Sequence, residues 1–89
     1  MRDRVLLIRE QLQAAFEPDA LEIVDDSARH AGHAGARDGR GHFKVRIVSE
    51  RFAGKRPIER HRMVYAALGD LMQTDIHALN VTALSSQDG

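Results

Sequence analysis

The sequence has 89 residues, enough for one small domain, and it contains no cysteine. The chain therefore cannot form a disulfide, and it cannot bind zinc or iron through thiolates of its own. The apolar run at residues 5–8 is too short for the core of a signal peptide or for a membrane span. We expect a cytoplasmic protein that is not inserted in a membrane.

Charge is unevenly distributed along the chain, although the formal net charge is zero. Residues 37–62 contain nine Lys and Arg against three Asp and Glu, whereas residues 1–36 and 63–89 each have three more acidic than basic residues. A basic segment of this kind indicates an acidic partner, either protein or nucleic acid, or else neutralisation by acids of the same chain. The pattern alone leaves both interpretations open.

The first half of the chain predicts a helix, a strand and a loop. Apolar residues recur at helical spacing between residues 5 and 16, and Pro18 ends this pattern. The expected inward-facing residues of the helix are Val5, Ile8, Leu12, Ala15 and Phe16. Leu21 and Ile23 flank a glutamate, as in a short half-buried strand. Four glycines without periodicity in residues 28–41 predict a long exposed loop, and such loops often carry function.

The second half predicts two strands separated by a helix. Apolar and polar residues alternate over residues 43–48, and residues 76–84 form a second strand-like run. Pro57 suits the first turn of a helix that we expect to continue to Met72. The expected apolar face of that helix consists of Ile58, His61, Val64, Tyr65, Leu68 and Met72, so His61 and Tyr65 should pack inward. Residues 85–89 are expected to form a disordered tail.

The order helix, strand, strand, helix, strand predicts an α+β fold of two layers. The long second helix allows the second and third strands to run parallel through a right-handed crossover. The first two strands should be antiparallel, giving a three-stranded mixed sheet covered on one face by both helices. We expect this single domain to occupy residues 1–84.

Several segments together are similar to a known family. They are residues 27–35, the sequence His42-Phe43-Lys44-Val45, residues 51–55, residues 58–65 with Arg60-His61-Arg62-Met63-Val64-Tyr65, and Ile76-His77-Ala78-Leu79. In this order and spacing they resemble BolA-like proteins over residues 3–84. The resemblance implies a class II KH-like fold and no catalytic activity. It also implies a monothiol glutaredoxin partner, a bridging 2Fe–2S cluster and, in some members, DNA-binding transcriptional regulation.

The same resemblance assigns candidate metal ligands. His77 matches the family's C-terminal ligand, His30 best matches the ligand in the loop, and His33 is a substitute three residues on. Two imidazoles can replace two thiolates on one iron of a 2Fe–2S cluster. The resemblance implies that the partner supplies a cysteine and a bound glutathione. The alternative is that His77, in phase with Leu79 and Val81, is a partly buried strand histidine, while His42 is structural or lies on the surface.

A second candidate site is basic. Lys55, Arg56, Arg60 and Arg62 lie around the start of the predicted second helix, where they could contact the phosphates of duplex DNA. The alternative is that these side chains pair with acids such as Glu50 and Glu59. The Gly-x-x-Gly sequence at residues 32–35 lies between two strands and not between two helices, which argues against KH-type RNA binding. No nucleophile and base stand in a catalytic pattern.

Three functions therefore remain from the sequence: shared binding of a 2Fe–2S cluster, regulation through DNA, and stand-alone metal binding or a homodimeric adaptor. We expect the protein without its partner to be a monomer or a weak homodimer.

Overall fold

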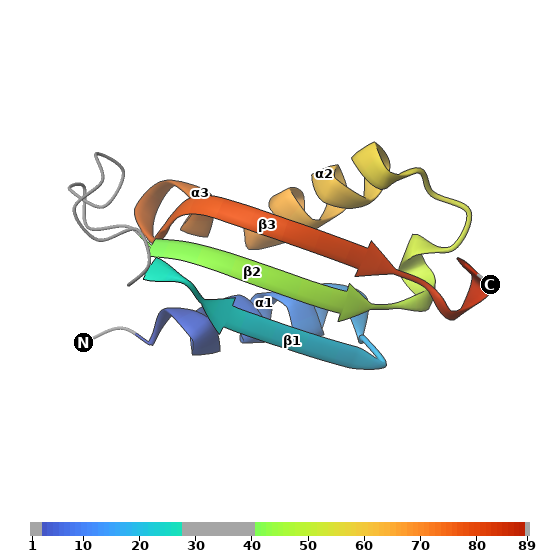
Figure 1. The fold of residues 1–89 in the computed structure, drawn as a ribbon, viewed down its shortest axis with the longest axis horizontal. Coiled ribbons are helices and arrows are strands. Elements are labelled where there is room, and N and C mark those ends of the chain that lie inside the picture. The colour runs from blue at the N-terminus through green and yellow to red at the C-terminus, as the bar shows by residue number, and fades with distance from the viewer. Residues whose placement is uncertain (1–2, 28–40, 89) are drawn as a thin grey trace.

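The computed structural model describes residues 3–27 and 41–88. Its elements are α1 (Arg4–Phe16), β1 (Ala20–Asp25), β2 (Gly41–Val48), η3 (Glu50–Phe52), α2 (Pro57–Leu68), α3 (Leu71–Thr74), β3 (Ile76–Leu84) and η4 (Ser86–Asp88). Strand β2 lies in the middle of the sheet, antiparallel to β1 and parallel to β3. Both long helices lie behind the sheet in Figure 1, and no helix of the described residues lies on the opposite face, which is called the open face below. The predicted α+β two-layer fold is confirmed.

The core forms where the sheet meets the helices. Along β2 the residues alternate as predicted: Phe43, Val45 and Ile47 are buried, and the residues between them point to the open face. Helix α1 contributes Ile8, Leu12 and Phe16, whose spacing places them on one face of the helix. The helix ends after Phe16, where the buried Ser49 hydroxyl donates to the Phe16 carbonyl at 2.8 Å. The apolar periodicity of α1 and β2 is therefore the source of the core.

Helix α2 differs from its prediction in length and in orientation. It ends at Leu68 because Gly69 adopts a φ of +52°, which non-glycine residues rarely accept, and a separate short helix α3 follows. The buried residues are Arg60, Val64 and Leu68. His61 is exposed, and so are Ile58 (56%) and Tyr65 (40%), so the prediction that His61 and Tyr65 pack inward is wrong. Val64 and Leu68 are buried as predicted, and Met63 and Ala67 pack beside them against the core. The prediction missed Arg60 because it selected residues by apolar character alone.

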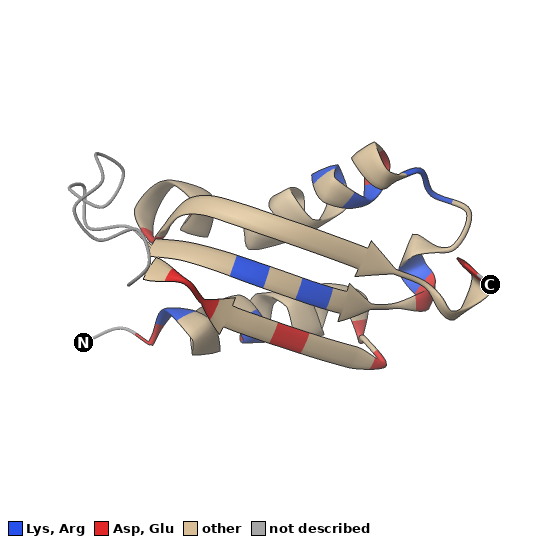
Figure 2. Cartoon of the chain, viewed as in Figure 1, with Lys and Arg blue, Asp and Glu red and all other residues tan. Residues whose placement is uncertain are grey.

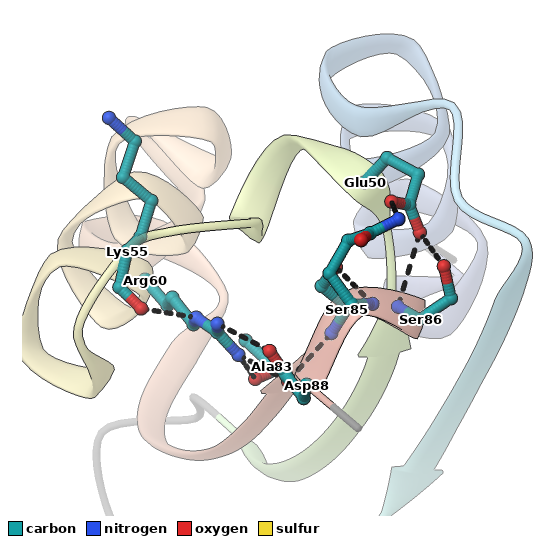
Figure 3. A network of polar contacts seen from close by, with 8 residues as sticks. Glu50, Lys55, Arg60, Ala83, Ser85, Ser86 and Asp88 are labelled. Carbon is teal, nitrogen blue, oxygen red and sulfur yellow. Dashed lines mark hydrogen bonds and ion pairs between the residues drawn. The ribbon is translucent and has the colours of Figure 1, made fainter.

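The end of the chain also differs from its prediction. Ser85 is buried, and η4 folds back onto the connector between β2 and α2 (Figure 3). The Glu50 carboxylate accepts hydrogen bonds from the backbone N–H and the hydroxyl of Ser86, and from the Gln87 amide. Asp88 accepts from the Ser85 backbone N–H at 2.9 Å and pairs with Arg60. Residues 85–88 therefore belong to the folded domain and do not form a frayed tail.

Gly41, at the start of β2, has no room for a side chain. A Cβ at this buried position would lie 2.7 Å from both the Phe43 ring and the Ser27 hydroxyl. Overpacking of this kind costs about 1–3 kcal/mol, so Gly41→Ala should lower the free energy of unfolding by that amount in urea titrations. The control is Gly54→Asn: no neighbour lies within 4 Å, and asparagine tolerates the φ of +75°. We expect that control to cost less than Gly41→Ala, because only the backbone strain at the positive φ acts there; equal effects would contradict the steric explanation.

Candidate functional site

A shift in strand register sets the position of His77. Gly41 pairs with Ile76, but the next residue, His42, pairs with Ala78, so His77 is an extra residue in β3. Ile76 points into the core and is fully buried, and the inward alternation resumes at Leu79 and Val81. The extra residue places His77 on the outside of the protein, where it is exposed. The alternative that His77 is a partly buried strand histidine is therefore wrong.

The same register brings a second histidine next to His77. The ring centroids of His42 and His77 are 5.3 Å apart, and the ring planes are inclined at 52°. His42 is half-buried at the start of β2, and its backbone N–H donates to the Ser27 hydroxyl at 3.0 Å. Its carbonyl accepts from the Asp26 N–H at 2.7 Å. Two imidazoles from neighbouring strands thus meet at one end of the sheet, a juxtaposition that the sequence analysis did not predict.

The backbone just before His77 is held by charged and polar contacts. The Asp75 side chain is buried, with its carboxylate 3.4 Å from the Arg4 guanidinium of α1 and 2.9 Å from the Thr74 hydroxyl. The Asp75 carbonyl accepts from the Gly41 N–H at 2.9 Å. These contacts join the beginning of α1, the beginning of β2 and the residue before β3. They fix the strand end from which His77 projects.

The two imidazoles have the chemistry of half a metal site. Neutral imidazole is a good ligand for iron, zinc and copper. Within residues 3–27 and 41–88, no group of three or more His, Cys, Asp or Glu side chains is placed to hold a metal ion. His30 and His33, the predicted loop ligands, lie outside the described residues. The described donors therefore fit a centre that takes further ligands from elsewhere.

The four predicted phosphate-binding residues separate into two groups. Lys55, Arg56 and Arg62 are exposed, and the Arg56 Nε donates to the Glu59 carboxylate at 3.1 Å. The alternative of internal pairing thus holds for Arg56, and it lowers the pKa of Glu59 through the hydrogen bonds from Arg56.

Arg60 forms the second group alone, because its guanidinium is turned inward. The residue is 9% exposed, and it donates to the carbonyls of Lys55 and Ala83 at 2.9 and 3.0 Å. Two further bonds of 2.7 and 2.8 Å reach the Asp88 carboxylate (Figure 3). These bonds hold the pKa of Asp88 at about 2 and raise the pKa of Arg60. Arg60 therefore fastens η4 to α2 and is not presented to solvent as its neighbours are.

The open face of the sheet carries a pocket that the sequence analysis missed. It has a volume of about 330 Å³, and Asp26, His42, Lys44, Ala78 and Asn80 are among the residues that line it. Lys44 and Arg46 are the two basic residues of β2 and appear as the blue bands on that strand in Figure 2. The alternation along β2 could have placed Lys44 and Arg46 outward; the contribution of Asn80 requires the pairing with β3.

The fold and the sequence together assign the chain to a family. Residues 12–88 match the family described as BolA-like protein, and the chain belongs to that family. It is 50% identical over 72 residues to the DNA-binding transcriptional regulator BolA of Escherichia coli (strain K12), a match that covers 81% of this chain and 66% of that protein. It is 44% identical over 85 residues to the chloroplastic/mitochondrial SufE-like protein 1 of Arabidopsis thaliana, covering 90% of this chain and 23% of that protein.

Solved structures agree with this assignment. The BolA domain of SufE1 from Arabidopsis thaliana has a TM-score of 0.86 at 37% identity, with 100% of this chain and 99% of that chain covered. The solution structure of BolA1 from Mus musculus has a TM-score of 0.80 at 35% identity, with 99% and 69% covered. The chain thus covers almost all of the SufE1 BolA domain, but it spans only 23% and 66% of the lengths of the curated relatives named above.

Within the part of the chain that the structure describes, no helix is both long and apolar enough to cross a membrane.

Proposed function

We propose that this protein binds a 2Fe–2S cluster jointly with a monothiol glutaredoxin, catalyses no reaction itself, and acts in iron–sulfur cluster trafficking or in iron and redox regulation. The observation that carries the proposal is the exposed His77 ring, turned out of the core by the register shift and placed 5.3 Å from the His42 ring. When bound, such a cluster accepts imidazole nitrogens in place of two of its four thiolate ligands.

The composition of the chain requires a second molecule in this arrangement. The sequence has no cysteine, so it cannot complete the ligand set of the cluster. A monothiol glutaredoxin would supply one thiolate from its active-site cysteine and one from a bound glutathione. An exposed pair of histidines at the end of a sheet suits a shared centre, because a partner can approach it from solvent.

The second ligand of this chain has three candidates. His30 and His33 are outside the described residues, but His30 follows Ser27 by three residues, so the covalent chain keeps it within about 11 Å of Ser27. Ser27 is itself bonded to the backbone of His42, next to His77. We therefore keep His30 as the first choice and His33 as the second. His42 is the third candidate, because its ring centroid is only 5.3 Å from that of His77.

The test is cluster assembly followed by visible absorption and circular dichroism. The protein is mixed with a monothiol glutaredoxin, glutathione, iron and sulfide, and a spectrum distinct from that of the glutaredoxin homodimer is expected. His77→Ala should abolish that spectrum. His61→Ala is the matched control, since His61 is an exposed histidine on α2, and it should leave the spectrum unchanged. The variants His30→Ala, His33→Ala and His42→Ala then identify the second ligand. Identical spectra for wild type and His77→Ala would exclude His77 as a ligand.

A second candidate function is binding of duplex DNA. It is supported by the relative of 50% identity whose name is DNA-binding transcriptional regulator, and by the exposed Lys55, Arg56 and Arg62 near the start of α2. Binding through phosphates predicts an affinity that falls steeply as salt rises. Arg62→Gln should reduce the slope of log affinity against log salt concentration by about 1, because one phosphate contact is lost. His77→Ala should not alter that slope. If both variants bind DNA as the wild type does, Arg62 is not a contact.

A further inference from the structure

The pocket on the open face of the sheet combines both signs of charge next to the histidine pair. Asp26, Lys44 and Asn80 are among the residues that line it. The Asp26 carboxylate and the Lys44 ammonium are 4.0 Å apart, with the Asp26 side chain 13% exposed. His42 lines the same pocket, and the His42 ring is also 5.3 Å from the His77 ring. Figures 1 and 2 show that none of the helices in residues 3–27 and 41–88 covers this face of the sheet.

The size and accessibility of the pocket fit part of a small molecule. Its volume of about 330 Å³ is at the lower end of the range for ligand sites, which run from roughly 300 to 1,000 Å³. The Lys44 side chain is 52% exposed, so a ligand carboxylate can reach its ammonium without a change in the fold. Ala78 has only a methyl group on this exposed surface, which leaves space beside Asn80.

The adjacent negative and positive side chains of Asp26 and Lys44 fit a ligand that is a zwitterion. In an α-amino acid, the ammonium and the carboxylate are attached to one carbon and therefore lie close together. A carboxylate and an ammonium of the protein that are themselves adjacent can pair with both groups at once, Asp26 with the ligand's ammonium and Lys44 with its carboxylate. The amide of Asn80 can both donate and accept a hydrogen bond.

We propose that this pocket binds the γ-glutamyl end of glutathione. That end is an α-amino acid zwitterion, whereas the glycine end of glutathione has a carboxylate alone. The source of the glutathione rests on the proposed function, in which the partner brings glutathione to the histidine pair. Because His42 lines the pocket and its ring is 5.3 Å from that of His77, a molecule seated in the pocket lies next to the histidine pair. The chain thus contributes to holding the thiol ligand in addition to supplying imidazoles.

The experiment is a titration of ¹⁵N-labelled protein with reduced glutathione in the absence of iron, followed by amide NMR shifts. The protein has no cysteine, so no mixed disulfide can form. Saturable shifts are expected at Lys44, Ala78 and Asn80. The fragment γ-glutamylcysteine should reproduce them, and cysteinylglycine should not. Lys44→Gln should weaken binding about fivefold or more. Arg46→Gln, which removes a charge from the same strand and face outside the pocket, should leave binding unchanged.

A second variant tests the pocket by shape. Ala78→Leu fills the space on an exposed surface and should abolish the shifts, whereas Thr82→Leu, farther along the exposed side of β3, should not. Absence of saturable shifts, or equal losses in Lys44→Gln and Arg46→Gln, would overturn the inference.

The two proposals fail in different ways. A cluster spectrum that depends on His77, without glutathione shifts in the pocket, would support the proposed function and contradict the glutathione site. Glutathione shifts in a protein that assembles no shared cluster would support the glutathione site and contradict the proposed function.

Discussion

Replacing Phe52 with alanine is expected to lower the free energy of unfolding by about 3–5 kcal/mol, as for other fully buried aromatic side chains. Phe52 has no exposed surface and is the largest of the fully buried side chains in the described residues. Its ring centroid lies 4.8 Å from that of Phe16 at the end of α1. The residue belongs to η3, so it anchors the connector between β2 and α2 against the first helix.

The measurement is urea unfolding followed by far-ultraviolet circular dichroism. Domains of this size are stable by only about 5–15 kcal/mol, so Phe52→Ala should be close to unfolding at 37 °C. Phe52→Leu keeps most of the volume and should lose about 1.5 kcal/mol or less. Exposed Tyr65 provides the aromatic control, and Tyr65→Ala should cost far less. A loss below about 1 kcal/mol for Phe52→Ala would show that the core collapses around the cavity.

The pair of Arg60 and Asp88 should make stability dependent on pH in the acid range. Hydrogen bonds from Arg60 lower the pKa of Asp88 from its ordinary value of 3.8 to about 2. A carboxyl group with a lowered pKa stabilises the folded state at all pH values above its unfolded pKa. That contribution is lost as pH falls through about 4 toward 2. We expect the difference in urea midpoint between wild type and Asp88→Asn to be constant from pH 5 to 7 and to shrink below pH 4.

The matched variants separate this ion pair from other charges. Arg60→Met should lower the urea midpoint at neutral pH, because it removes all four donated hydrogen bonds of the guanidinium. Arg62→Met, an exposed arginine two residues along the same helix, should change it little. A difference between wild type and Asp88→Asn that persists unchanged at pH 2 would mean that ionisation of Asp88 contributes nothing to stability.

The parts of the fold that follow from local pattern were predictable from the sequence. The helical spacing in α1 and the alternation in β2 both repeat over consecutive residues, and each gave the correct inward face. The inward face of α2 was predicted correctly at Val64 and Leu68 but not at Arg60, which is buried through contacts with Ala83 and Asp88, 23 and 28 residues away. Such burial depends on how the chain end folds back, and nothing in the helix sequence specifies it.

In the candidate site, too, the features that depend on contacts between distant segments were not predictable from the local sequence pattern. His77 was predicted as a ligand by resemblance, which nothing in the structure tests, but its exposure follows from a register shift against a strand 35 residues earlier in the chain. Alternation alone placed it inward with Leu79. The position of His42 beside His77 and the pocket of Lys44 and Asn80 also arise from the pairing of β2 with β3. Pairing between strands distant in sequence cannot be inferred from the alternation of either strand.

The placement of the chain ends decides how the protein should be tagged for metal and partner measurements. Arg4 contacts Asp75, two residues before His77, so the start of α1 lies near the histidine pair, and an N-terminal tag is joined to the chain a few residues before it. The described C-terminal residues lie at the opposite end of the sheet in Figure 1, separated from His77 by the seven residues of β3 that follow it, or roughly 23 Å. An N-terminal hexahistidine tag would add six competing imidazoles at the candidate centre. A cleavable or C-terminal tag keeps that end of the sheet open to the proposed partner.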